Sequence, residues 1–259
     1  MNEGLIYKIW RVIYPALLLF FVYFVVYIIA ILTYGSFFSD RFADTDAFMA
    51  YAGDFISIIA LTAGGAVSYL FYRKESSDEH GGIIKKPLRL LAVFLMGIFA
   101  SHALSITVSL INMSADIGSY QQTEQMLSTS GIFITILKTV ILAPLAEETA
   151  FRGLIYGRMR RYGMGFWLSA VISSLLFALY HMNLLQGIYA FIFGILLCLI
   201  YKKYGSLIMP MLMHAASNAL SVVMQCTGFD YPSVTVYIIV MILTYGLSAA
   251  IYFLWIRKN

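Results

Sequence analysis

Two adjacent carboxylates near the middle of the chain are the residues whose placement most clearly calls for a chemical explanation. Glu147 and Glu148 end an apolar run, and Arg152 follows Glu148 by four residues. On a helix, Glu148 and Arg152 share a face and can form an ion pair, whereas Glu147 points about 100° away. A charged group inside a membrane helix costs about 2.5–3.5 kcal/mol even on lenient insertion scales, so it usually faces a wet interior. The pair therefore predicts a buried polar site.

Pro144 lies three residues before Glu147. Proline removes a backbone donor and clashes with an earlier carbonyl, so we expect the helix to kink there. Irregular backbone at membrane depth is tolerated where it lines a water-filled cavity. The simpler alternative treats both carboxylates as residues of a cytoplasmic helix end, because Arg152 and Arg158 follow soon after. That alternative explains a lone glutamate better than an adjacent pair.

Two further polar pairs follow downstream. His181 shares a helix face with Phe177, and His214 shares one with Asn218. A lone histidine in a bundle is usually structural, and we interpret His102 in that way. Two histidines, an asparagine and two glutamates on three helices favour a common site instead. Neutral histidine accepts protons near pH 7, a buried carboxylate can share that task, and asparagine can donate to an oxyanion.

In this order, the residues resemble the motifs of the CPBP family, the CAAX-processing and bacteriocin-processing (Abi) intramembrane endopeptidases. The motifs are EExxxR from Glu147, FxxxH ending at His181 and HxxxN from His214. Phe193-Gly194 and residues 204–207 also resemble the linking pattern of the family. The resemblance covers roughly residues 140–220, and the first 130 residues match only as hydrophobic helices. Each motif is weak alone, but three in order are specific.

The resemblance implies a glutamate-dependent peptidase with a membrane cavity open to the cytoplasm. Carried over position by position, Glu147 would act with His181 to hold and activate a water molecule. Glu148 would pair with Arg152 and shape the site.

His214 and Asn218 would stabilise the tetrahedral oxyanion, again by resemblance. Whether the family needs a metal is disputed, and Glu147, His181 and His214 are residue types that suit a catalytic Zn²⁺ site with one open position. No HExxH motif is present, however. Asparagine is a poor zinc ligand and a good oxyanion donor, so the chemistry slightly favours a reaction without a metal, with Zn²⁺ as the alternative.

The expected partners are the lipid bilayer and a membrane-associated protein or peptide substrate. The resemblance implies either prenylated CAAX proteins or peptide precursors such as bacteriocins. The many Ile and Tyr residues favour a low-GC bacterium, and hence a bacterial cell membrane and peptide substrates. A catalytically silent scaffold or immunity factor of the same family is the closest alternative. A proton-coupled transporter is less favoured, because the sequence contains no inverted repeat.

The composition predicts a polytopic all-α membrane bundle. The chain has 259 residues, of which 61% are hydrophobic and 12% charged, against about 45–50% and about 25% in soluble domains. We expect one membrane domain over 1–259, with its catalytic core helices at 131–225. The apolar runs are long and lack period-2 alternation, so they predict helices rather than a barrel. We expect eight spans, at 9–34, 55–72, 87–112, 131–151, 166–181, 184–201, 206–225 and 233–256.

The basic residues predict the orientation of these spans. The first apolar run is too long for a cleavable signal, so we expect it to be retained. Loops are expected at 39–54, 73–86 and 116–130. With both termini in the cytoplasm, 15 of the 17 Lys and Arg residues fall on the inside, as the positive-inside rule requires. The net charge of +4 therefore needs no nucleic-acid partner. Lys138 lies within a span, where we expect it to snorkel outward, with a carboxylate partner as the alternative.

Overall fold

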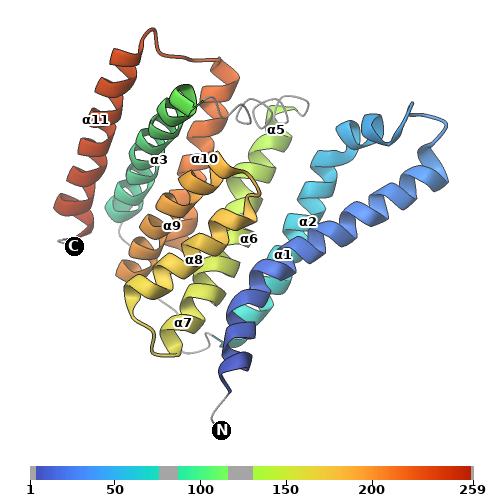
Figure 1. Cartoon of the computed structure of the whole chain (residues 1–259), viewed down its shortest axis with the longest axis horizontal. Helices are drawn as coiled ribbons and strands as arrows, with labels where there is room; N and C mark the ends of the chain where they lie inside the picture. Colours follow the sequence, from blue (N-terminus) through green and yellow to red (C-terminus); the bar gives the residue numbers. More distant parts are fainter. Residues whose placement is uncertain (1–3, 76–86, 116–130, 258–259) are drawn as a thin grey trace.

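The computed structural model describes residues 4–75, 87–115 and 131–257. In these ranges the chain forms eight helical rods and no strands. The prediction of an all-α bundle of about eight helices is therefore confirmed. In Figure 1, the hairpin of α1 and α2 diverges on one side, α3 and α11 lie on the other, and the helix that carries Glu147 lies between them.

The rods have the following bounds, with η marking π-helical segments. They are α1 Leu5–Thr33, continued by η1 Tyr34–Phe38; α2 Thr45–Glu75; α3 Pro87–Ala115; the motif helix, which joins α5 Ile132–Thr135, η2 Ile136–Leu142, α6 Ala143–Glu148, η3 Thr149–Tyr156 and α7 Gly157–Arg161; α8 Phe166–Tyr180; α9 Leu184–Tyr204; α10 Ile208–Thr227; and α11 Val234–Ile251, continued by η4 Tyr252–Ile256.

Five of the described helices are long and apolar enough to cross a membrane: α1, α2, α3, α9 and α11. Their most apolar stretches differ in burial, from 11% in α1 and α11 to 56% in α3. Because large apolar side chains cover the outside of α1 and α11, lipid must be their solvent. The protein is therefore an integral membrane protein, with α1 and α11 at its periphery.

Two expected boundaries are wrong. The loop expected at 39–54 ends early, because α2 begins at Thr45 after Asp44 accepts a hydrogen bond from the Ala47 amide at 2.8 Å. This is the usual geometry of a helix N-cap. The span expected to end at residue 151, which is the motif helix, instead continues to Arg161. Most of the loops expected at 73–86 and 116–130 lie outside the described residues.

The turn between α8 and α9 is very short, as the closely spaced spans predicted. Met182 adopts a left-handed φ of 53°. Asn183 then caps α9, because its side chain accepts hydrogen bonds from the amides of Leu185 and Gln186 at 3.0 and 3.1 Å. This turn lies directly after His181, so it helps to set the position of that residue.

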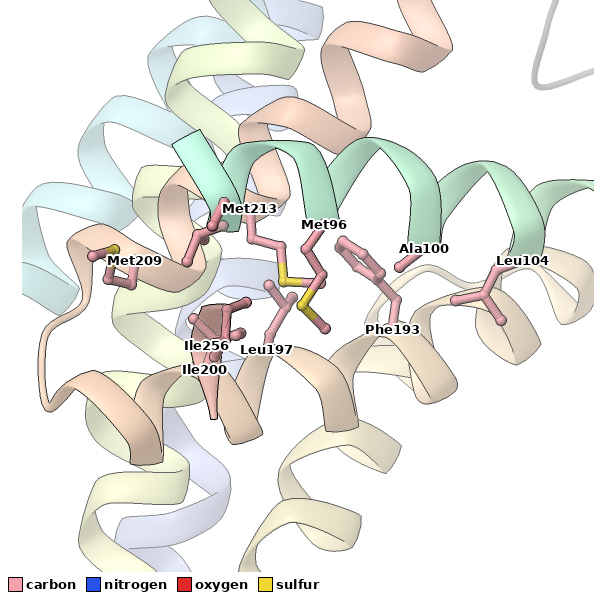
Figure 2. Close-up of a cluster of buried hydrophobic side chains, with 11 residues drawn as sticks. Met96, Ala100, Leu104, Phe193, Leu197, Ile200, Met209, Met213 and Ile256 are labelled. Atoms are coloured by element: carbon pink, nitrogen blue, oxygen red, sulfur yellow. The ribbon is translucent and has the colours of Figure 1, made fainter. Parts of the chain in front are cut away.

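Helices α3, α9, α10 and η4 enclose an apolar core, shown in Figure 2. Gly97 permits the closest approach in this core. A Cβ atom at Gly97 would lie 2.5 Å from the Met213 carbonyl oxygen, so only glycine fits at this crossing. The core thus supports the backbone of α10 directly before His214. The labelled core residues are Met96, Ala100, Leu104, Phe193, Leu197, Ile200, Met209, Met213 and Ile256.

Arg158 fastens the α1–α2 hairpin to the motif helix. Its guanidinium donates to Glu75 at 2.7 and 2.9 Å, to the Tyr14 hydroxyl at 2.5 Å and to the Arg11 carbonyl. The start of α1, the end of α2 and the end of the motif helix therefore meet at one end of the bundle. This arrangement agrees with the expectation that these three ends share one side of the membrane.

Candidate active site

The motif helix departs from α-helical geometry on both sides of the two glutamates. The π-helical segments η2 and η3 flank the short α-helical segment α6, which contains Glu147 and Glu148. The Ala143 amide donates to the Lys138 carbonyl, five residues earlier. Such π-helical turns are frequent at functional sites. The irregularity expected at Pro144 is thus a π-helical segment that ends at Leu142.

Glu148 lies at the centre of a fully buried polar cluster. Its Oε1 accepts from Arg152 Nη1 at 2.7 Å and lies 2.8 Å from His214 Nδ1. Both Glu148 and Arg152 are 0% exposed. The Arg152 guanidinium also lies 4.4 Å from the centre of the Phe177 ring. One carboxylate oxygen therefore joins the motif helix to α10.

Glu147 lies on the other side of the same imidazole. Its Oε2 is 3.8 Å from His214 Nε2, which is too long for a hydrogen bond. Glu147 is 7% exposed and also interacts electrostatically with His181 and Glu148. Tyr180 is a further electrostatic neighbour of this carboxylate. The two adjacent glutamates thus reach the two nitrogens of one histidine.

His181 ends α8 with its ring held from one side. Its Nδ1 lies 2.9 Å from the Phe177 carbonyl oxygen, and since a carbonyl only accepts, Nδ1 carries the proton. In the neutral ring, Nε2 then presents a lone pair. The ring also packs edge-on against Phe177 at 4.7 Å. The arrangement leaves Nε2 as the nitrogen that can accept a proton.

Asn218 reaches the motif helix from α10. Its Nδ2 donates to the Thr139 carbonyl at 2.7 Å. One amide hydrogen is therefore bound within the protein, and the second remains for another acceptor. The structure thus brings Glu147, Glu148 and His214 into direct contact range and ties Asn218 to the same helix. The chemical roles of these residues stay predictions.

Comparison with known proteins agrees with this placement. Residues 129–220 match the family model described as type II CAAX prenyl endopeptidase Rce1-like. We call this matched segment, which is similar to that family, the Rce1-like domain. The resemblance to the CAAX-processing family is thereby confirmed for the segment that carries all three motifs.

One curated relative matches a similar length of chain. An uncharacterized 24.3 kDa protein of Escherichia coli is 38% identical over 97 residues, which are 36% of this chain and 45% of that protein. The chain therefore matches less than half of the length of this relative. No solved structure matches the chain.

Two residues of the Rce1-like domain that shape the site carry no obvious chemical signal in the sequence. Ser173 of α8 donates to the carbonyl of Phe151, in η3, at 2.9 Å. Gly194 of α9 faces Arg152, because a Cβ atom there would lie 3.0 Å from Nη2 and 2.9 Å from Ser174 Oγ. Gly194 belongs to the linking pattern noted above, whereas a serine in an apolar helix is too common to be a signal.

Lys138, near the start of the Rce1-like domain, does not extend its side chain toward the membrane surface as expected. Its Nζ pairs with Asp54 of α2, and the two side chains are only 16% and 13% exposed. Burying this ammonium between two helices requires a charged partner, and Asp54 provides it because α2 begins earlier than expected. His102 lies outside the domain and hydrogen-bonds with the Tyr231 hydroxyl at 2.6 Å.

The donor set of the Rce1-like domain does not fit a metal ion as placed. Among the residues that the structure describes, no three His, Cys, Asp or Glu side chains gather closely enough to hold one. Zinc ligands lie about 2.0–2.2 Å from the metal, so Glu147, His181 and His214 would have to move closer together to share one. Zn²⁺ dependence stays the alternative, and a chelator can test it.

A cavity of about 490 Å³ lies beside the site, between α2, the motif helix and the start of α10. The motif helix lines it with Leu142, Leu145, Ala146 and Thr149. Glu147 and the two histidines are not among its lining residues. The cavity therefore faces the side of the helix that is turned away from the polar cluster.

Proposed function

We propose that the protein is an intramembrane endopeptidase that hydrolyses a peptide bond of a membrane-associated protein or peptide. The observation that carries this proposal is the contact of Glu147 and Glu148 with the two ring nitrogens of His214, inside the Rce1-like domain. An adjacent carboxylate pair buried in an apolar helix is costly, and acid–base chemistry explains why it is present.

Glu147 and His181 form the proposed base. His181 directs its protonated Nδ1 to the Phe177 carbonyl, so Nε2 can hold a water molecule. The Glu147 carboxylate takes a proton from that water as its oxygen attacks the substrate carbonyl carbon. The carboxylic acid then returns the proton to the departing amine when the C–N bond breaks.

His214 and Asn218 form the proposed oxyanion site. Asn218 keeps one amide hydrogen free of the Thr139 carbonyl. The Nδ1 proton of His214 is donated to Glu148. To donate to the oxyanion from Nε2 as well, the ring must carry a second proton. Donors held in place before the reaction stabilise the negative charge without reorganisation.

Arg152 and Glu148 hold His214 rather than touching the substrate. The Glu148 carboxylate accepts from both partners through one oxygen. This fixes the imidazole plane in the same way that a buried carboxylate orients a catalytic histidine in other hydrolases. Glu148 and Arg152 are therefore positioning residues in this proposal.

The positive-inside pattern supports a cytoplasmic location for both termini, and the resemblance to the family implies that the active site opens to the same side. A bacterial cell membrane and a peptide precursor are the proposed setting and substrate, with prenylated CAAX proteins as the alternative. The reaction is proposed to proceed without a metal, because the donor set of the described residues does not fit one.

Peptide release from detergent-purified protein tests the proposal. A prenylated CAAX peptide and a bacteriocin-type leader peptide serve as the two probes, and mass spectrometry locates the cleaved bond. We expect cleavage by the wild type to fall by at least about 10³-fold in Glu147→Gln, since the base is removed at nearly constant shape. His181→Gln should lose cleavage, whereas the matched control His102→Gln should retain it.

A chelator arm completes the experiment. We expect cleavage to persist with the chelator. Loss of activity that added Zn²⁺ restores would instead establish the metal-dependent alternative. Cleavage by Glu147→Gln at the wild-type rate would overturn the proposed mechanism, and no cleavage of either probe by any variant would favour the scaffold alternative.

A further inference from the structure

The backbone carbonyl of Thr139 lacks the partner that helical geometry would give it. The Ala143 amide donates to the Lys138 carbonyl, five residues earlier, so the chain here is in π-helical register. In that register, the next donor, to the Thr139 carbonyl, would be the amide of residue 144. Residue 144 is proline, which has no amide hydrogen.

Asn218 occupies the vacant bonding position. Its Nδ2 lies 2.7 Å from the Thr139 oxygen. A carbonyl left unpaired within the membrane interior is costly, so a side-chain donor is strongly favoured here. The contact also fixes which way the amide points, since only the nitrogen end can donate to a carbonyl.

We infer that Pro144 is a positioning residue for Asn218. By withholding an amide hydrogen from Thr139, Pro144 keeps one carbonyl open, and this carbonyl orients the Asn218 side chain. One amide hydrogen anchors the side chain, and the other is directed by that anchor. That the second amide hydrogen of Asn218 bonds to the oxyanion rests on the proposed function.

The same device occurs a second time in the molecule. Pro15 lies inside α1, and the carbonyl four residues earlier, that of Arg11, accepts from Arg158 Nη1. Four residues is the α-helical spacing that Pro15 leaves open. In both places, a side chain from a distant helix takes the carbonyl that a proline has freed. The recurrence is expected if a carbonyl that a proline leaves without a backbone donor attracts a side-chain donor from another helix.

A double-mutant cycle of Pro144→Ala and Asn218→Ala tests the inference. Thermal unfolding in detergent is measured for the wild type, both single variants and the double variant. Asn218→Ala leaves the Thr139 carbonyl unpaired on the wild-type background, but not on the Pro144→Ala background, where alanine supplies an amide hydrogen. We expect Asn218→Ala to lower the unfolding midpoint at least twice as far in the protein with Pro144 as in the Pro144→Ala variant.

Cleavage is measured on the same four proteins. We expect Asn218→Ala to lower kcat about 100-fold, as for loss of one oxyanion donor, and Pro144→Ala to lower it about tenfold with KM within twofold. The combined loss should be no larger than that of Asn218→Ala alone, because both changes act through one side chain. The control is Pro210→Ala in the first turn of α10, where the Ser206 carbonyl already accepts from Met209. Pro210 is buried, as Pro144 is, so Pro210→Ala should shift the midpoint only by the packing that it removes, show no coupling to Asn218→Ala, and leave kcat unchanged.

The two readouts separate failure of the inference from failure of the proposed function. Equal midpoint shifts on both backgrounds would overturn the inference, whatever the activity. Coupled midpoints together with wild-type cleavage by Asn218→Ala would support the anchor and overturn the oxyanion role. If Asn218→Ala does not fold, Asn218→Ser replaces it, because a serine hydroxyl bonds to its own helix and leaves Thr139 unpaired.

Discussion

Two buried arginines, six residues apart on the motif helix, are bound in very different ways. Arg158, 1% exposed, donates from all three guanidinium nitrogens to acceptors on α1 and α2. Arg152, 0% exposed, donates from Nη1 to Glu148. Its Nε and Nη2 have no nitrogen or oxygen partner among the residues that the structure describes.

The difference distinguishes a structural cluster around Arg158 and Glu75 from the candidate active site around Arg152 and Glu148. Glu75 accepts from Arg158, Arg11 and Arg161, so it joins helix ends and contacts no histidine in the described part of the chain. Glu148 instead divides one oxygen between Arg152 and His214. Buried polar groups are normally satisfied, and exceptions need an explanation such as a catalytic role. In the described part of the chain, Arg152 therefore retains two nitrogens without a nitrogen or oxygen acceptor, with the Cys198 sulfur nearby, whereas every guanidinium nitrogen of Arg158 is bound.

The largest expected effect comes from neutralising the carboxylate in each cluster. Glu148→Gln should lower kcat by about 10²–10³-fold, because His214 loses the charge that orients it. Glu75→Gln should leave cleavage per folded molecule within twofold and lower the unfolding midpoint. Rate measurements on the folded fraction of each variant provide the check. Equal losses of kcat in both variants would remove the distinction between the two clusters.

Replacing each arginine by lysine sharpens the same comparison. Lysine keeps the charge but loses the rigid fork of donors. Arg158→Lys should therefore destabilise the protein by about 2–4 kcal/mol, somewhat less than the ~3–5 kcal/mol for removing one partner of a buried ion pair, because the charge is kept. Arg152→Lys, which must replace one bond to Glu148, should cost less than half as much. Unfolding in detergent measures the free energy lost in each variant. A larger loss for Arg152→Lys would contradict the interpretation of Arg158 as the residue that joins the helix ends.

Local spacing was enough to predict much of this architecture. The apolar runs have the length of membrane helices, and they predicted the eight rods to within a few residues at most ends. The ion pair of Glu148 and Arg152 followed from their separation of four residues along a helix. Both features depend on neighbours in sequence, which is why they are visible in the chain alone.

Features that depend on distant partners could not be predicted in this way. Asp54 pairs with Lys138 across 84 residues, and no local pattern selects it from the other acidic residues. The bond from Asn218 to Thr139 requires the π-helical register of η2, for which propensity carries no signal. Asp44 was a missed local signal, because its capping position would have extended α2 to Thr45.

A glycine beside each arginine provides a steric test. A Cβ atom at Gly194 would lie 2.9 Å from Ser174 Oγ and 3.0 Å from Arg152 Nη2. At Gly157, the nearest atom is Nη1 of the flexible Arg161 side chain at 3.2 Å. Gly194→Ala should therefore cost about 1–3 kcal/mol by overpacking and lower kcat. Gly157→Ala should change both within error, and a comparable loss there would show that packing around the whole helix is equally tight.

The smallest expected effect lies at the turn that follows His181. Met182 holds a φ of 53° with its side chain 83% exposed, a conformation that glycine adopts without a steric penalty. Met182→Gly should therefore raise the free energy of unfolding by up to about 1 kcal/mol, less the entropy that glycine adds to the unfolded chain. Cleavage should stay within twofold, because the Phe177 carbonyl holds the His181 ring from inside α8. A more stable variant with much slower cleavage would show that the strained turn, rather than this carbonyl, sets the orientation of the His181 ring. The α8–α9 turn would then belong to the candidate active site, unlike the structural cluster around Arg158.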